Sequence, residues 1–171
     1  MNHKEKCEYL EERIKRLNLI GLALSTEDDL DKLFEMIMEE ARHITNADGR
    51  TLYMKSDDAK MMDFKIVRND SLKLVMGGTS GNDIPWPAMA LFDDNGEPNH
   101  KSVVAYAANT GKTVNINDAY KEEGFDFSGM KAVDKSTGYH SESFLTVPLK
   151  NHENEIIGVM QLINSIDEKS G

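Results

Sequence analysis

Acidic and aromatic residues are interspersed in one stretch of the sequence, residues 117–140, where they could bind a small molecule. The acids are Asp118, Glu122, Glu123, Asp126 and Asp134, and the aromatic residues are Tyr120, Phe125, Phe127 and Tyr139. Polar groups among aromatic rings in a long connection are what a ligand pocket requires, and a solvated surface loop would tolerate the same residues. The local sequence leaves both interpretations open.

Catalysis is not indicated by the residues that stand next to one another. His140, Ser141 and Glu142 are consecutive, and Asp118 lies close to Tyr120. Successive residues of a strand point to opposite faces of a sheet, so such runs do not bring a general base beside a nucleophile. The sequence also lacks a G-x-S-x-G motif, a phosphate-binding loop and a zinc signature. We therefore expect no enzymatic activity.

Composition restricts the compartment and the partners. Cys7 is the only cysteine, which excludes a disulfide or a multi-cysteine metal site within one chain and favours a reducing compartment, the cytoplasm. The net charge of −10, without a basic stripe, disfavours binding to nucleic acid or to an anionic membrane. No apolar run approaches the ~20 residues that a membrane-spanning helix needs. A chain of 171 residues is long enough for one well-buried core.

Two helices are predicted at the start of the chain. The first has a short heptad seam of apolar or small residues between charged ones, formed by Cys7, Leu10, Ile14, Leu17, Gly21 and Leu24. The seam predicts either a coiled coil or one amphipathic helix that packs on its own domain. In the second helix, Ser25 or Thr26 is expected as the cap, and apolar residues from Leu30 to Ile44 form the buried stripe.

Strands are predicted for much of the remaining chain. Alternation with period two predicts strands at residues 51–54, 62–66, 72–76 and 113–116, and a strand–turn–strand unit at residues 141–164. Asn99 is expected to cap a helix that ends before Gly111. The segment 77–98 is long and broken by Gly and Pro, and Trp86 within it indicates packing against another element. This order predicts an α+β domain with an antiparallel sheet.

Four segments in the second half of the sequence carry a family resemblance. They are NINDAY at residues 115–120, DKSTGY at 134–139, FLTVPLKN at 144–151 and IGVMQLIN at 157–164. Together they resemble a GAF domain, and the similarity extends over about residues 22–164. The sequence is most similar to GAF domains of bacterial signalling proteins. It is more distantly similar to the cyclic-nucleotide-binding GAF domains of phosphodiesterases.

The resemblance implies a GAF fold, a six-stranded antiparallel β-sheet with helices on both faces and amphipathic helices at the N-terminus. It divides the chain into a signalling and dimerisation helix, residues 1–25, and a GAF domain, residues 26–171, with a truncated C-terminal exit helix. It also implies a small-molecule-sensing role in a bacterial signal-transduction protein. The partners would be a second copy, bound through the N-terminal helices, and an output domain: a kinase, a cyclic-dinucleotide enzyme or an HD-type phosphodiesterase. A ligand-free dimerisation module is the alternative.

A ligand pocket is implied at the start of the helix after Asn99 and in the last strand. Val103 and Val104 would offer backbone N–H groups to a phosphate, and Gln161 would reach the ligand from the last strand. Each has another interpretation. Valines at such positions are more often part of the core, and Gln161 could equally bond to a neighbouring strand.

Three further residues are implied as ligand contacts from the long connection and the strand after it. They are Asp134, Thr137 and Ser141, whose polar side chains would hydrogen-bond to the ligand. The same residue types commonly cap a short helix or complete a turn, so both roles stay open.

The cyclic-nucleotide-binding members carry Phe-Asp before Gly-Gly at the end of the third strand, where the pair stacks on and hydrogen-bonds to the purine. This chain has Val75 and Met76 before Gly77 and Gly78. Val75 and Met76 would therefore line the pocket without reading a base. The expected ligand is a small molecule other than cyclic GMP, and its identity stays open.

Cofactor-binding members of the family are not matched. Cys7 lies in the first helix, which argues against bilin attachment through a pocket cysteine and against the cysteine-based methionine sulfoxide reductases. His100 and His140 flank the implied pocket, but they lack the spaced ligand set that haem or iron would need. We therefore expect no metal in the pocket.

Overall fold

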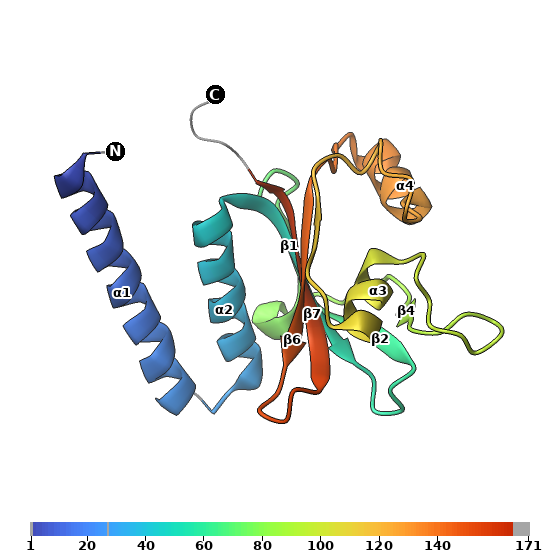
Figure 1. Ribbon diagram of the computed structural model, residues 1–171, viewed down its shortest axis with the longest axis horizontal. Coiled ribbons are helices and arrows are strands. Elements are labelled where there is room, and N and C mark those ends of the chain that lie inside the picture. The colour runs from blue at the N-terminus through green and yellow to red at the C-terminus, as the bar shows by residue number, and fades with distance from the viewer. Residues whose placement is uncertain (1, 27, 166–171) are drawn as a thin grey trace.

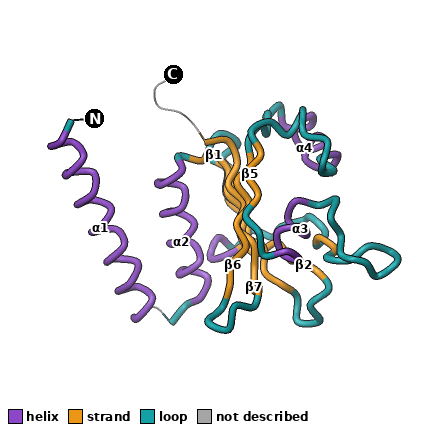
Figure 2. Tube along the Cα trace, in the orientation of Figure 1, coloured by secondary structure: helices purple, strands orange, loops and turns teal. Residues whose placement is uncertain are grey.

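One antiparallel sheet separates two layers of helices in the computed structural model, which describes residues 2–26 and 28–165 (Figure 1). The helices are α1 (His3–Thr26), α2 (Leu30–Thr45), α3 (Val103–Thr110) and α4 (Ser128–Thr137), and η1 (Gly78–Ser80) is a 3₁₀ turn. The strands are β1 (Ala47–Lys55), β2 (Met61–Asn69), β3 (Leu74–Gly77), β4 (Met89–Ala90), β5 (Val114–Ile116), β6 (Phe144–Lys150) and β7 (Ile156–Ser165). Helices α1 and α2 lie on one side of the sheet, and α3 and α4 lie on the other (Figure 1 and Figure 2).

The strand order is β3-β2-β1-β7-β6-β5, and each pairing along it is antiparallel. The predicted α+β class, the antiparallel sheet and the helices on both faces are confirmed. The two-residue strand β4 pairs with β2 outside this order, so the sheet has seven strands where six were expected. Among the described helices, none combines the length and the apolar character that crossing a membrane requires.

The last strand, β7, lies in the middle of the sheet and contributes to both faces. Val159 packs with residues of α3, whereas Met160 and Leu162 pack with residues of α2. Side chains alternate between the two faces along a strand, so Gln161 and Ile163 share the α3 face with Val159. The α3 face is the side on which a ligand pocket is predicted.

The second helix begins later than predicted. Helix α1 continues through Thr26, and the cap of α2 is Asp29. Its Oδ1 accepts hydrogen bonds from the N–H groups of Asp31 (3.0 Å) and Lys32 (3.3 Å). The prediction of Ser25 or Thr26 as the cap is wrong, because both residues still belong to the last turn of α1.

Helix α1 is the outermost element, with α2 between it and the sheet (Figure 1). An ion pair between Arg16 and Glu40 (3.7 Å) joins the two helices. The seam residues Leu10, Ile14 and Leu17 are 46%, 58% and 60% exposed. These three side chains are therefore not covered by the described part of the chain, and they remain open to an apolar partner.

Elements on the other side of the sheet differ from the prediction in two places. The cap of α3 is Ser102, whose Oγ accepts a hydrogen bond from the N–H of Ala105 (3.3 Å), while Asn99 bonds in the preceding turn. Helix α4 lies within the stretch predicted as a long connection, and it begins without a side-chain cap. The predicted packing of Trp86 is confirmed by its edge-on contact with Phe64 of β2, with ring centroids 5.4 Å apart.

Candidate functional site

Polar side chains form a row across the sheet on its α3 face. Thr51 of β1 pairs with Gln161 of β7, and Gln161 pairs with Thr146 of β6. All three are buried, with exposed fractions of 5%, 7% and 0%. The amide Nε2 of Gln161 donates a hydrogen bond to Oγ1 of Thr146 at 3.1 Å. We call Thr51, Gln161 and Thr146 the polar row.

The polar row lies between two apolar clusters that both include the first turn of α3. Tyr53 and Val159 pack in one cluster with Val104, and Phe144 packs in the other with Val103. Helix α3 contacts both β6 and β7, the strands that carry two of the row's residues. Polar groups within an apolar interface are costly unless they find hydrogen-bond partners. The polar row is the polar part of an otherwise apolar interface on this face.

The side chains of Val103 and Val104 belong to the core, because these residues are only 5% and 3% exposed. Their backbone N–H groups belong to the first turn of α3, where helical N–H groups lack partners within the helix. Ser102 satisfies the N–H groups of Ala105 and Tyr106. Within the described residues no partner is found for the N–H groups of Val103 and Val104. Both interpretations of these two valines thus have support, one from the side chains and one from the backbone.

The buried carboxylate of Asp134 is already satisfied within the chain. Oδ1 accepts from the hydroxyl of Ser141 (2.8 Å), and Oδ2 accepts from the N–H of Ser141 (2.7 Å) and the hydroxyl of Tyr120 (2.8 Å). The hydrogen bond to Asp134 raises the pKa of Tyr120 above its ordinary value. The structure therefore brings Asp134 and Ser141 together, but as partners of each other. We call Asp134, Ser141 and Tyr120 the Asp134 lock.

Thr137 is exposed in the last turn of α4 and bonds within that turn. Its hydroxyl donates to the carbonyl oxygen of Val133 (2.9 Å) and accepts from the N–H of Tyr139 (3.3 Å). These contacts match the interpretation of Thr137 as a residue that completes a turn.

Val75 and Met76 lie on opposite faces of the sheet. Met76 pairs with Val67, which in turn pairs with Thr51, so Met76 shares the α3 face with the polar row. Val75 pairs with Arg68 on the α2 face and is 48% exposed. Only Met76 of the two is on the face that carries the polar row.

A second hydrogen-bond network holds the segment that leads from α4 into β6. The Oδ1 atom of Asn164 accepts from the N–H groups of Glu142 (2.8 Å) and Ser143 (3.2 Å), and its Nδ2 donates to the hydroxyl of Tyr139 (3.0 Å). The hydroxyl of Tyr139 donates to Asp48 of β1 (2.6 Å). Burial, together with this bond to Asp48, raises the pKa of Tyr139 above its ordinary value. The network fixes the chain after α4 to two central strands.

The two candidate histidines pack on separate aromatic rings. His100 contacts Tyr106 edge-on, with centroids 5.4 Å apart, and His140 stacks on Tyr120 at 4.4 Å. Among residues 2–26 and 28–165 of one chain, we find no group of three or more His, Cys, Asp or Glu side chains that could bind a metal ion together.

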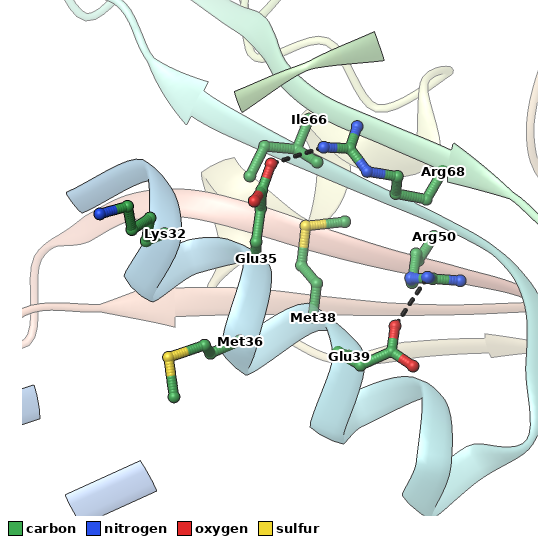
Figure 3. A pocket seen from close by; sticks show the side chains of 8 residues that line it. All are labelled: Lys32, Glu35, Met36, Met38, Glu39, Arg50, Ile66 and Arg68. Atoms are coloured by element: carbon green, nitrogen blue, oxygen red, sulfur yellow. Dashed lines mark hydrogen bonds and ion pairs between the residues drawn. The ribbon is translucent and has the colours of Figure 1, made fainter. Parts of the chain in front are cut away.

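A hollow of about 480 Å³ lies on the opposite face, between α2 and strands β1 and β2 (Figure 3). Its walls carry two ion pairs, Glu35 with Arg68 (2.5 Å) and Glu39 with Arg50 (2.7 Å). Arg50 also bonds to Asp70 (3.1 Å). These four charges therefore have partners within the chain.

Two members of the polar row, Thr51 and Thr146, were not predicted as site residues. Each stands two positions from a buried aromatic residue of the same strand, Tyr53 and Phe144, on the same face of the sheet. The signal available in the sequence was a polar residue two positions from an apolar aromatic residue in a predicted strand. The sequence does not show, however, that β1 and β6 both lie beside β7.

Comparison with known proteins decides the family. The family model of the GAF domain matches residues 29–170. The chain belongs to the GAF family. Among solved structures, the GAF domain of a phosphoenolpyruvate-protein phosphotransferase from Acinetobacter is similar with a TM-score of 0.60 and 14% identity, covering 92% of this chain and 79% of that one. A free methionine-R-sulfoxide reductase from Neisseria meningitidis is similar with a TM-score of 0.57 and 14% identity, covering 89% and 75%. At these identities the likeness concerns the fold alone.

One curated relative shares a shorter segment. The dual 3',5'-cyclic-AMP and -GMP phosphodiesterase 11A of Takifugu rubripes is 45% identical over 64 residues, which are 37% of this chain. The matched segment spans only 7% of that protein's length.

Proposed function

We propose that this GAF domain is a regulatory module that binds a small polar molecule between the sheet and α3. It would pass the occupancy of that site through paired N-terminal helices to an output domain of a bacterial signalling protein in the cytoplasm. The observation that carries the proposal is the polar row, buried beneath an otherwise apolar interface.

The chemistry of the row favours a ligand with both donors and acceptors. A glutamine amide can form about four hydrogen bonds, two as donor and two as acceptor. The contact from Gln161 to Thr146 uses one of them. The backbone N–H groups of Val103 and Val104 would add donors for an anionic or carbonyl oxygen. In this proposal Met76 lies at the β3 end of the same face. Asp134 and Ser141 hold the chain after α4 in place instead of contacting the ligand, and Thr137 completes the last turn of α4.

Dimerisation is proposed to occur through residues 1–25, as distinct from the GAF domain at residues 26–171. The exposed seam residues Leu10, Ile14 and Leu17 support it, because an apolar heptad stripe is stabilised by burial against a second stripe. The output domain would be a kinase, a cyclic-dinucleotide enzyme or an HD-type phosphodiesterase in a longer protein.

The ligand's class is tested by thermal shift against a panel of cyclic nucleotides, purines, amino acids and small carboxylates. The panel includes cyclic AMP and cyclic GMP because one relative is a dual phosphodiesterase for these two nucleotides. We expect no shift with cyclic GMP, because this chain has Val75 and Met76 where the cyclic-nucleotide-binding members have Phe-Asp. A ligand at ~100 times its Kd adds about 2.7 kcal/mol of stability. For a chain of this size, the melting temperature should rise by roughly 5–10 °C.

Variants at the polar row link that shift to the site. Gln161→Leu should abolish the ligand-induced shift, because leucine fills a similar volume without hydrogen bonds. Asn115→Ala, an exposed change in the edge strand β5, is the matched control and should keep the full shift. A shift that survives Gln161→Leu would contradict the proposed site.

A ligand-free dimerisation module is the second candidate function. It is favoured by the Asp134 lock and by the side chains of Val103 and Val104, which all have partners within the domain. A panel without any shift, together with a dimeric mass, would favour this candidate over the sensor.

A further inference from the structure

The start of α1 is fixed by a reciprocal pair of hydrogen bonds. The N–H of Glu5 donates to Oδ1 of Asn2 (2.9 Å), and the N–H of Asn2 donates to the carboxylate of Glu5 (2.7 Å). This arrangement satisfies helix N–H groups that otherwise lack partners. His3 and Cys7, one turn apart, are therefore held on one face of a well-formed helix.

The two side chains meet at a separation that suits a shared metal ion. Sγ of Cys7 lies 3.6 Å from Nδ1 of His3, and Cys7 is exposed. Bonds of about 2.3 Å from zinc to sulfur and about 2.05 Å from zinc to nitrogen, at a tetrahedral angle, separate the two ligand atoms by about 3.6 Å. The pair thus supplies half of a tetrahedral S₂N₂ set, the set typical of Zn²⁺.

His3 extends the seam of α1 toward the N-terminus. It precedes Cys7 by four residues and Leu10 by seven, so His3 and Cys7 occupy adjacent core layers of the heptad. In a parallel, in-register pair of helices, these layers bring His3 and Cys7 of both copies together. The flanking charges favour that orientation, because Lys6 of one copy would face Glu11 of the other.

We propose that two copies of this chain share one Zn²⁺ ion, bound by His3 and Cys7 of each copy at the N-terminal end of paired α1 helices. The site rests on the proposed dimer and is incomplete without the second copy, since the described residues of one chain supply no third ligand. On binding, each thiol gives up its proton to solvent and each imidazole binds through its neutral nitrogen. The metal would fix the orientation and register of the helices that are proposed to carry the signal.

Cobalt titration of the whole chain tests the site. Co²⁺ replaces Zn²⁺ in tetrahedral sites and reports thiolate ligation by its absorption. We expect saturation at one Co²⁺ per two chains and an absorption from thiolate-to-metal charge transfer. Adding Zn²⁺ should displace the Co²⁺ and remove this absorption. Saturation at one ion per chain, or spectra without thiolate bands, would overturn the proposal.

Sedimentation without metal separates this proposal from the proposed dimer. A dimeric mass without Co²⁺ uptake would overturn the metal site and leave the dimer standing. A monomeric mass without Co²⁺ uptake would overturn both. Uptake of half an equivalent of Co²⁺ supports the site, and a mass that rises from monomer to dimer on uptake supports it further.

Variants assign the ligands without removing the seam. Cys7→Val keeps an apolar residue in the seam and should abolish the charge-transfer absorption while leaving the mass measured without metal unchanged. His3→Leu should remove the tetrahedral spectrum in the same way. His152→Ala, in the exposed turn between β6 and β7, is the control and should bind Co²⁺ as the unaltered chain does.

Discussion

The carboxylate of Asp134 accepts three hydrogen bonds from within the chain, two from Ser141 and one from Tyr120. Replacing it with alanine leaves the buried N–H of Ser141 without its acceptor. Such a loss costs about 2 kcal/mol in the free energy of unfolding. We expect Asp134→Ala to lower the melting temperature by roughly 4–8 °C in a calorimetric scan without ligand.

Thr137→Ala is the matched comparison for Asp134→Ala. Thr137 is exposed and bonds only within its own turn, so its replacement should change stability by less than about 0.5 kcal/mol. If Asp134→Ala left the melting temperature unchanged and weakened ligand binding instead, the Asp134 lock would be a binding element and not a structural one.

Asp70 gives the protein a pH-dependent contribution to stability. Burial opposes ionisation of Asp70, but hydrogen bonds from Arg42 (2.6 Å) and Arg50 (3.1 Å) outweigh it and lower its pKa below the ordinary value. A carboxylate whose pKa is lower in the folded state stabilises above its unfolded pKa of about 4, and the contribution disappears as the pH falls through the folded pKa.

Asp70→Asn should therefore destabilise the protein at pH 7, and its effect should shrink as the pH is lowered from about 4, the unfolded pKa of Asp70, through the lower folded pKa. The side chain of Asp70 is 41% exposed, so we expect only about 0.5–1 kcal/mol at pH 7 after solvent screening. Urea denaturation of both proteins across this pH range measures the difference, with the exposed Asp94→Asn as the control. A difference that is constant with pH would show that the carboxylate charge is not its source.

At the scale of elements, α2 is fastened to the sheet by a line of ion pairs as well as by its apolar stripe. Asp31, Glu35 and Glu39 follow one another at intervals of four residues and pair with Lys65, Arg68 and Arg50. Residues four apart share one face of a helix, so these acids form a single row facing the strands.

The central pair of that row should show strong energetic coupling. The side chains of Glu35 and Arg68 are only 25% and 13% exposed. Glu35→Leu or Arg68→Met alone should cost about 2 kcal/mol, because each leaves a partly buried charge unpaired. The double variant should cost at least about 1 kcal/mol less than the sum, as measured by a double-mutant cycle in urea. The exposed pair Lys4 and Glu8 is the control and should show under about 0.5 kcal/mol of coupling.

The strands were predictable from the sequence because their apolar residues alternate, and β2, β6 and β7 lie where that alternation predicts them. Helix α4 was not predicted, because it is short, has few apolar residues, and buries only Asp134. The cap of α2 was mispredicted because Ser25 and Asp29 both precede acidic and apolar residues, and only the length of α1 distinguishes them.

The candidate site was predictable in part. Gln161 lies on the face where the family resemblance implies a pocket, but the alternation of one strand cannot tell which residues of other strands stand beside it. Thr51 and Thr146 join it only through the register of β1, β7 and β6. Asp134 was named as a ligand contact, and its buried bonds to Ser141 could not be known before the fold brought the two together.

At the scale of the whole molecule, α1 should decide the oligomeric state. Deleting the residues before Ser25 removes the seam and the ion pair from Arg16 to Glu40, and it leaves α2 and the sheet in the chain. We expect the full chain to sediment as a dimer and the shortened chain as a monomer. The far-ultraviolet circular dichroism of the shortened chain should lose only the contribution of α1. An unchanged mass would place the dimer contact elsewhere on the molecule.

The central pairing of the sheet, β1 with β7, also has a consequence for how the chain reaches its native state. Leu52 pairs with Met160, so the middle of the sheet closes a loop of more than 100 residues. Loop closure of this length is entropically expensive, and proteins rich in such non-local contacts fold slowly. During synthesis, the hairpin of β1 and β2 must wait with an open strand edge until β7 leaves the ribosome. In pulsed hydrogen exchange, amides of the β6–β7 hairpin should gain protection before those that bridge β1 and β7, and simultaneous protection would contradict this order. Aggregation during folding, rather than instability once folded, is then the main hazard for variants of the central strands.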